Sequence, residues 1–386
     1  MNRLFPLSIP ALFIGSIAGC PTPSNPTERV IACWDLNGNG LPDADEDVNG
    51  DGAADVLDCH GAQGPAGANG RDGADASASL YGDGSSGART ITGDERFETA
   101  DDANQLWTDF TVEAGATLRV QSGAVIRCTG RFTNHGTIVV EPGAQGGDRS
   151  AFDATTLEGV SRPAALGVNT LAASGGEVGD ASSARSGGSG GDGISEFEAR
   201  VALRISTRAG SGGGAALGGS GAGGGGITIL AQGTIENGGA ILADGADAES
   251  EGGGGGGGGI ILLASGESIT NRLTGSIFVR GGGGGAASSA VGAGGGGGGG
   301  IIHFISPVVQ DLGNSTADGG RAGGTSLETM VSAGLRSGGG GGGGSGGAGG
   351  RGGPLDAGAL VAPNPGEDGS RGFVLITLQE PELILR

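Results

Sequence analysis

Oxygen-bearing side chains recur at a fixed spacing in two adjacent windows of the chain, 35–46 and 47–58. In each window they occupy positions 1, 3, 5, 9 and 12, while glycine occupies position 6. A hard divalent cation such as Ca²⁺ takes roughly six to eight oxygen ligands, and position 7 can add a backbone carbonyl oxygen. The spacing therefore predicts two structural calcium ions, with ligands from Asp35, Asn37, Asn39, Leu41, Asp43 and Glu46 and from Asp47, Asn49, Asp51, Ala53, Asp55 and Asp58.

The two windows have the spacing of the EF-hand calcium loop, but they adjoin and leave no room for flanking helices. They resemble the helix-poor calcium repeats of dockerins and of thrombospondin type 3 modules, which implies a structural role rather than a switch. Asp58 is one methylene shorter than Glu46, which weakens the case for bidentate ligation in the second loop. The alternative is a solvated acidic linker, although mutual repulsion among so many carboxylates opposes it. We expect a weak affinity of the extracellular order, roughly 10⁻⁴ to 10⁻³ M.

The first 19 residues have the pattern of a secretory signal. Arg3 precedes an apolar stretch from Leu4 to Ile17, and small residues follow before Cys20. The ending Ile-Ala-Gly-Cys resembles the lipobox of bacterial lipoproteins, which implies that Cys20 is lipidated and anchors the protein. By the same resemblance, Pro21 in place of Asp implies the outer membrane. The alternative is an ordinary cleaved signal with an incidental cysteine.

A proline-rich linker, 20–32, precedes the calcium-loop module, 33–59. Cys33 and Cys59 bracket the two loops, and disulfides persist in exported proteins, so we predict a bridge between them. In the loop-entropy model a ring of about 27 residues stabilises the folded state by roughly 3 to 4 kcal/mol. Cys128 lies in an apolar run, and we expect it to point inward as a small hydrophobic residue.

A spacer over 60–79 contains five consecutive Gly-X-Y triplets that begin at Gly61. They resemble a bacterial collagen-like segment, because a triple helix requires glycine at every third residue. Only Pro65 stiffens the triplets, so we expect an extended spacer. Trimerisation through this segment is the alternative.

The composition excludes several classes of function. The formal net charge of the 386 residues is −21, and every basic residue is arginine. Such a chain repels phosphates, which argues against nucleic-acid binding. Without lysine it has neither a Walker A motif nor a Schiff-base lysine. His60, His135 and His303 are isolated, and no catalytic constellation is evident.

Apolar segments recur between glycine tracts in the remaining region, 80–386. Three segments, 125–140, 227–242 and 260–279, share the order apolar strand, glycine turn, asparagine, glycine and second apolar strand. The asparagine and glycine positions suit turns with positive φ. The asparagines at 237 and 271 are 34 residues apart, and those at 134 and 237 are 103 apart, close to three such periods. We therefore expect degenerate units near 168–173 and 201–205, a divergent copy over 301–309 and a closing strand over 373–378.

This repeat predicts a mainly β fold with a parallel β-helix or β-solenoid body. It is similar to the glycine-rich surface proteins of Gram-negative bacteria. The longest glycine runs, 252–259, 294–300 and 338–344, hold eight, seven and seven residues. One interpretation is that they pack side by side as polyglycine II helices, as in some phage adhesins and glycine-rich antifreeze proteins. The other is irregular arms whose similar lengths arose by codon slippage.

Together these features predict a non-enzymatic structural or adhesive lipoprotein on a bacterial surface, whose partners are the membrane and surface glycans or other envelope components. Two alternatives remain. A β-helix polysaccharide lyase or hydrolase would present a cleft with arginine and paired carboxylates. An ice- or glycan-binding module would present a flat, repeating Thr or Asn face.

Overall fold

The computed structural model describes two units, 1–72 and 73–386, which we treat separately. The described residues are 34–35, 37–47, 50–53, 58–59, 80–142, 189–193, 196, 219–288, 291–325, 339–341, 344, 346–353 and 365–385. The signal peptide, the proline-rich linker and the collagen-like spacer lie outside them.

In the described part of the larger unit, the strands are short and neighbouring strands of each sheet pair in parallel. They form an 11-stranded sheet and a 6-stranded sheet. The elements are β1 (Gly87–Ile91), β2 (Glu95–Arg96), α2 (Ala100–Ala103), β3 (Leu106–Val112), β4 (Thr117–Val120), β5 (Ala124–Cys128), β6 (Phe132–Asn134), β7 (Thr137–Val140), β8 (Gly226–Ala231), β9 (Ile235–Asn237), β10 (Ala240–Leu242), β11 (Ile260–Ser265), β12 (Ile269–Asn271), β13 (Ser276–Phe278), β14 (Ile301–Ile305), β15 (Val309–Asp311), β16 (Asn314–Thr316), β17 (Phe373–Thr377) and η2 (Pro381–Leu383).

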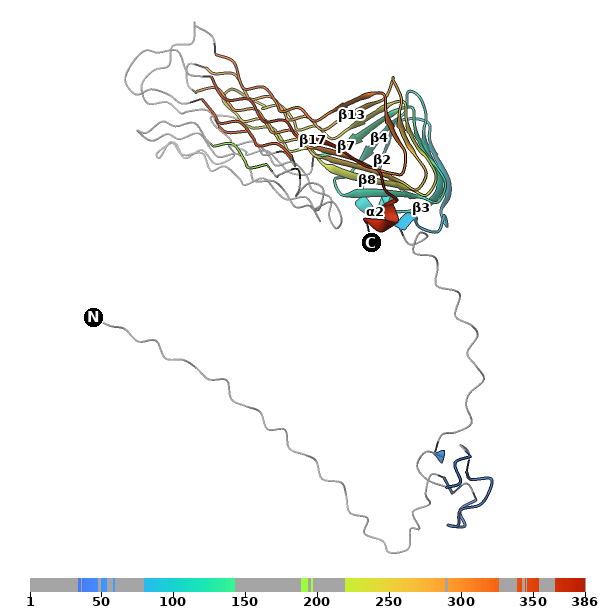
Figure 1. Cartoon of the computed structure of the whole chain (residues 1–386). Helices are drawn as coiled ribbons and strands as arrows, with labels where there is room; N and C mark the ends of the chain where they lie inside the picture. The colour runs from blue at the N-terminus through green and yellow to red at the C-terminus, as the bar shows by residue number, and fades with distance from the viewer. Residues whose placement is uncertain are drawn as a thin grey trace, which may run out of the picture. The chain divides into compact units, whose positions relative to one another are not determined.

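The strands wind into a solenoid with three faces, which we call the wall (Figure 1). The first face stacks β5, β8, β11, β14 and β17, the second stacks β6, β9, β12 and β15, and the third stacks β2, β4, β7, β10, β13 and β16. The long strand β3 spans the first two faces, because its start pairs with β5 and its end with β6. The predicted parallel β-solenoid is therefore confirmed.

The predicted spacing of three periods between Asn134 and Asn237 is wrong. The two asparagines are direct partners in the β6–β9 ladder, so they lie in adjacent rungs. One rung of wall needs only 20 residues, as the pairing of Thr117 with Thr137 shows. Most of the chain between β7 and β8 lies outside the described residues. The degenerate units expected near 168–173 and 201–205 lie outside the described residues, and no rung separates β6 from β9.

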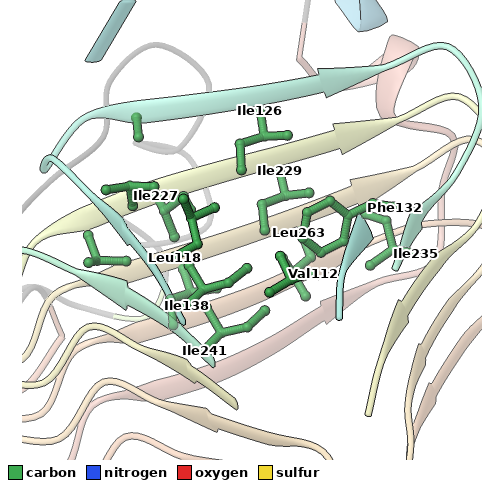
Figure 2. Close-up of a cluster of buried hydrophobic side chains, with 14 of the residues drawn as sticks. Val112, Leu118, Ile126, Phe132, Ile138, Ile227, Ile229, Ile235, Ile241 and Leu263 are labelled. Atoms are coloured by element: carbon green, nitrogen blue, oxygen red, sulfur yellow. The ribbon is translucent and has the colours of Figure 1, made fainter. Parts of the chain in front are cut away.

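The interior of the wall is filled by columns of aliphatic side chains. Because the strands pair in parallel register, alternate residues of successive rungs point to the same side. Figure 2 shows Ile126, Ile229 and Leu263 pointing inward from three successive strands. Phe304 continues this column on β14. At the N-terminal end Phe110 stacks on Phe132 with ring centroids 5.8 Å apart, so that the first rungs are closed by aromatic side chains.

A ladder of asparagines runs through the corner of the wall beside the second face. The side-chain amide of Asn134 donates to Asn237 Oδ1, and Asn237 donates to Asn271 Oδ1, both over 2.8 Å. Asn271 donates in turn to Asp311 Oδ1 over 2.8 Å. All three asparagines are buried, and each amide donates to the next rung. They end strands and stack; they do not serve as the left-handed turn residues that the sequence pattern suggested.

Glycine-rich segments leave the wall after the third-face strands β10, β13 and β16 and return at the next first-face strands, β11, β14 and β17 (Figure 1). We call these segments strokes and their assembly the bundle. The described strokes are 219–225, 243–251, 252–259, 279–288, 291–300, 317–325, 339–344, 346–353 and 365–372, with 342, 343 and 345 excepted. The 34-residue period is thus a rung of wall plus a pair of strokes.

Two neighbouring strokes are joined by a backbone hydrogen bond at every third residue. Gly255 N–H donates to the Gly295 carbonyl over 2.9 Å, and Gly258 N–H donates to the Gly298 carbonyl over 2.8 Å. A repeat of three residues per turn is that of the polyproline II type of helix, which polyglycine II shares. The runs 252–259 and 294–300 therefore pack side by side as ordered helices, as the first of the two interpretations requires.

The stroke 294–300 lies at the centre of the bundle. Its backbone exchanges hydrogen bonds with six other segments, namely 252–258, 279–285, 320–323, 339, 346–350 and 367–370. Glycine is required here by close approach. A Cβ atom on Gly297 would lie closer than 3.0 Å to the Gly256 carbonyl oxygen, and one on Gly300 would meet Gly259 in the same way. Neighbouring backbones thus occupy the space that side chains fill in the wall.

Candidate functional sites

The first predicted calcium loop wraps around the carboxylate of Asp35. Asp35 Oδ1 accepts the N–H of Asn39 over 3.0 Å, and Oδ2 accepts the N–H of Gly40 over 2.8 Å. Gly38 and Gly40 adopt left-handed conformations, with φ of 73° and 75°. The glycine at position 6 therefore makes the sharp turn that the spacing predicted, and Gly38 at position 4 makes a second one.

Position 12 closes the first loop from the other side. The carboxylate of Glu46 is fully buried and accepts the N–H groups of Asn37, over 3.4 Å, and Asp43, over 3.1 Å. The amides of Asn37 and Asn39 both donate to Asp43 Oδ2 over 2.7 Å. The side chains predicted at positions 1, 3, 5, 9 and 12 are therefore joined in one hydrogen-bonded cluster.

The second loop repeats the same wrap around Asp47. Asp47 Oδ1 accepts the N–H of Asp51 over 3.0 Å, and Oδ2 accepts the N–H of Gly52 over 2.8 Å. These donors occupy positions 5 and 6, as Asn39 and Gly40 do in the first loop. Gly50 and Gly52 are again left-handed, with φ of 76° and 90°. Two segments of different sequence thus share one loop geometry.

The oxygen atoms that each loop brings together show how well calcium would fit there. The first loop gathers carboxylate and amide oxygens, which are the ligands that Ca²⁺ prefers. Leu41 and Ala53 are exposed at position 7, and Asp58 is buried at the end of the second loop. Asn49 and Asp55 lie outside the described residues. Among the described part of the chain, no three His, Cys, Asp or Glu side chains converge as metal ligands, so the loops depend on their asparagines as well.

The cysteines divide into two kinds. Cys59 is disulfide-bonded, while Cys33 lies outside the described residues, so the pairing of Cys33 with Cys59 stays a prediction. Cys128 is a buried free thiol on the inner side of β5, and burial raises its pKa to about 12. Such a thiol is unreactive, in agreement with its expected role as a small hydrophobic residue. Cys20 lies outside the described residues.

A row of charges of alternating sign crosses the surface of the bundle. Asp244 pairs with Arg280 over 2.6 Å, and Asp318 pairs with Arg371 over 3.1 Å. The hydrogen bond that Arg280 donates to Asp244 is the main cause that raises the pKa of Arg280, and the charge of Asp318 raises it further. Successive charged residues of the row lie on neighbouring strokes.

Sequence reasoning missed this row, although the signal was present. Several outer strokes carry a larger side chain at every third position with small residues between, as in Asp318-Gly-Gly-Arg321 and Asp368-Gly-Ser-Arg371. In a helix of three residues per turn, every third residue points the same way. The intervening glycines at 319, 320 and 369 face neighbouring backbones too closely to carry a Cβ. Triplet periodicity therefore identifies the exposed side of each stroke.

The arginine and carboxylate pairs of the wall resemble structural ion pairs. Arg272 bonds Glu236 over 2.6 Å on the outside of the second face. This bond is the main cause that lowers the pKa of Glu236, whereas a general acid needs a raised pKa. His303 is buried, and its Nε2 lies 2.8 Å from Thr377 Oγ1.

One outward column of threonines follows the second face. Thr90, Thr111 and Thr133 stack in register, but Glu236 interrupts the column before Thr270. The asparagines form the buried ladder, so they add nothing to this face. On the described strands of this face, the repeating Thr or Asn surface of an ice- or glycan-binding module is therefore interrupted.

Comparison of the chain with protein-family models, with curated proteins and with solved structures found no match. No helix in the described ranges is long and apolar enough to cross a membrane. Function is therefore inferred from the loops, the wall and the bundle themselves.

Proposed function

We propose that the protein is a non-enzymatic structural or adhesive lipoprotein of a Gram-negative-type cell surface. An acyl chain on Cys20 anchors it to the outer membrane. Two calcium ions stiffen the loop module, and the collagen-like spacer holds the solenoid body away from the membrane. The body presents surface to glycans or other envelope components.

The observation that carries this proposal is the close packing of the glycine-rich segments of the body against one another. The strokes bury backbone against backbone and satisfy their N–H groups on one another. Such packing makes a stiff, hydrogen-bonded body from a chain with few apolar side chains. The outward charges pair with each other across the strokes. This arrangement suits a rigid surface element better than a reactive site.

The calcium part of the proposal rests on the shared geometry of the two loops. In each loop one buried or half-buried aspartate accepts N–H groups at positions 5 and 6. A divalent cation would neutralise the carboxylates that the loop holds together. Without helices beside the loops, binding stabilises the module and moves no other element.

Limited proteolysis of the full chain with and without a calcium chelator tests the metal. We expect chelation to make residues 33–59 sensitive to protease while the body stays protected, because only the loops depend on the ion. Unchanged digestion of this segment would show that the loops bind no calcium.

Matched variants sharpen this test. Asp35→Ala removes the position-1 carboxylate and should abolish calcium protection of the first loop. Asp45→Ala is the control, because Asp45 is exposed and occupies position 11, where no ligand is predicted. Equal calcium binding by both variants, measured by calorimetry, would contradict the assigned ligand set.

The anchor is tested by replacement of Cys20. We expect Cys20→Ser to lose incorporation of labelled palmitate and to leave the membrane fraction. Cys128→Ala is the matched control, because its thiol is buried in the wall. Membrane retention of Cys20→Ser would argue for an ordinary cleaved signal.

A further inference from the structure

The two ends of the wall are finished differently. At the N-terminal end, Phe97, Trp107 and Phe110 are buried beneath the first strands and α2. At the C-terminal end, β17 is the last strand of the first face. Its inward positions are exposed, with Val374 at 36%, Ile376 at 44% and the following Leu378 at 64%.

The exposed side chains at this end belong to the interior columns of the wall. Val374 pairs in register with Ile302, and Ile376 pairs with Phe304. Ile302 and Phe304 are fully buried in the core. Parallel partners point to the same side of a sheet. Val374 and Ile376 therefore lie at the end of the interior columns and are exposed to solvent. Val308 and Leu312, at the corners of the last complete rung, are exposed as well.

The edge of β17 carries none of the usual protection against pairing. Exposed edge strands are normally blunted by charge, proline or a bulge. The other terminal strands follow this rule, since β1 contains Arg89, β15 contains Asp311 and β16 is polar throughout. β17 reads Phe-Val-Leu-Ile-Thr and has neither charge nor proline. An apolar, uncharged edge of five residues is suited to bind another strand.

We propose that β17 joins two copies of this chain, edge to edge and antiparallel, into a two-fold dimer. The strand is self-complementary about Leu375. With Leu375 on the two-fold axis, Val374 faces Ile376 of the second copy, and the inward side chains of both copies stay on one side of the joined sheet. A pairing offset by one residue would place inward side chains against outward ones.

The same register continues beyond the paired strands. It places Arg371 opposite Gln379 and Ser370 opposite Glu380 of the second copy, so no two like charges face each other across the axis. The two-fold closes on itself, so the product is a dimer and not a filament.

The oligomeric state of the full chain tests this proposal, with Cys20→Ser so that acyl chains play no part in association. We expect a dimer by analytical ultracentrifugation, and its complete loss in Ile376→Lys with an unchanged circular dichroism spectrum. Leu273→Lys is the matched control, because Leu273 is 84% exposed in a turn away from this end, and it should stay dimeric. A monomer before mutation, a trimer, or a dimer that survives Ile376→Lys overturns the proposal.

Cysteine cross-linking tests the register even if the lysine variant unfolds. The double variant Val374→Cys/Ile376→Cys should form a covalent dimer on oxidation, because directly opposite Cα atoms lie about 4.5 to 5.5 Å apart. Val374→Cys alone should not, because Val374 of the second copy lies two residues away along the strand. Equal cross-linking by the single and double variants, or none by either, overturns the pairing.

Discussion

The wall and the bundle bury backbone in opposite ways. In the wall, strands are held apart by aliphatic columns such as Ile126, Ile229 and Leu263, which fill the interior (Figure 2). In the bundle, strokes approach so closely that their own carbonyl oxygens fill the space. The wall therefore depends on large side chains, and the bundle depends on their absence.

The difference shows that one chain can stack its repeats with two different sequence periods. Alternate residues point inward in the wall, which is the period of a strand. Every third residue points outward in the bundle, which is the period of a polyglycine II helix. Substitution to alanine therefore removes atoms in the wall and adds an atom in the bundle, and the following experiments measure both effects.

Removal of a core side chain should have the largest effect. Ile229→Ala leaves a cavity in the middle of a column, and we expect the free energy of unfolding to fall by about 2 to 5 kcal/mol. Urea denaturation of the full chain measures the loss. Thr228→Ala is the control on the same strand, because Thr228 points outward and is half-buried. Similar losses in both variants would contradict the assignment of the inner side of β8.

Addition of a methyl group to the bundle should have the next largest effect. Gly297→Ala forces a Cβ against the Gly256 carbonyl, and overpacking of this kind costs about 1 to 3 kcal/mol. Gly324→Ala is the matched control, because a Cβ at Gly324 meets nothing within 4 Å. Hydrogen exchange of the stroke amides should rise in the first variant and not in the second. Equal exchange would mean that the central stroke is not closely packed.

The asparagine ladder should contribute less. Asn237→Leu removes two ladder hydrogen bonds. Asn271 Oδ1 loses its donor, while the Asn134 amide keeps its bond to the Ala240 carbonyl, so we expect a loss of about 1 to 2 kcal/mol in the free energy of unfolding. Thr270→Val, on the outside of the neighbouring rung, serves as control. A neutral Asn237→Leu would show that side-chain packing alone holds this corner.

The smallest effect is expected from the exposed ion pair of Glu236 and Arg272. Arg272 lowers the pKa of Glu236, so the pair stabilises the fold above the carboxyl pKa of the unfolded chain. This contribution is lost as the pH falls through the lower pKa of the folded state. The native chain and Arg272→Met should therefore differ slightly at neutral pH and converge in acid, as thermal unfolding across this pH range will show. A constant difference would contradict the ion-pair origin.

The loops and the wall could be predicted from local sequence because their signals are local. Gly40 and Gly52 permit turns that depend on a few neighbouring residues, and the structure places both in the left-handed region. The strands Ile260–Ser265 and Ser276–Phe278 could be predicted from their apolar composition between glycine tracts. The rung count failed because Asn134 and Asn237 pair directly in adjacent rungs, although 103 residues separate them in the sequence.

By itself, the sequence determined that this chain repeats, that its repeats are β rungs joined by glycine tracts, and that oxygen ligands are spaced as in calcium loops. Only the tertiary structure decided that the glycine tracts are ordered. A glycine has no side chain, so the sequence does not indicate which segments pack against it. The order of the tracts depends on backbone contacts between strokes far apart in the chain. The same holds at β17, whose apolar residues read as core in sequence, whereas the structure exposes Val374 and Ile376.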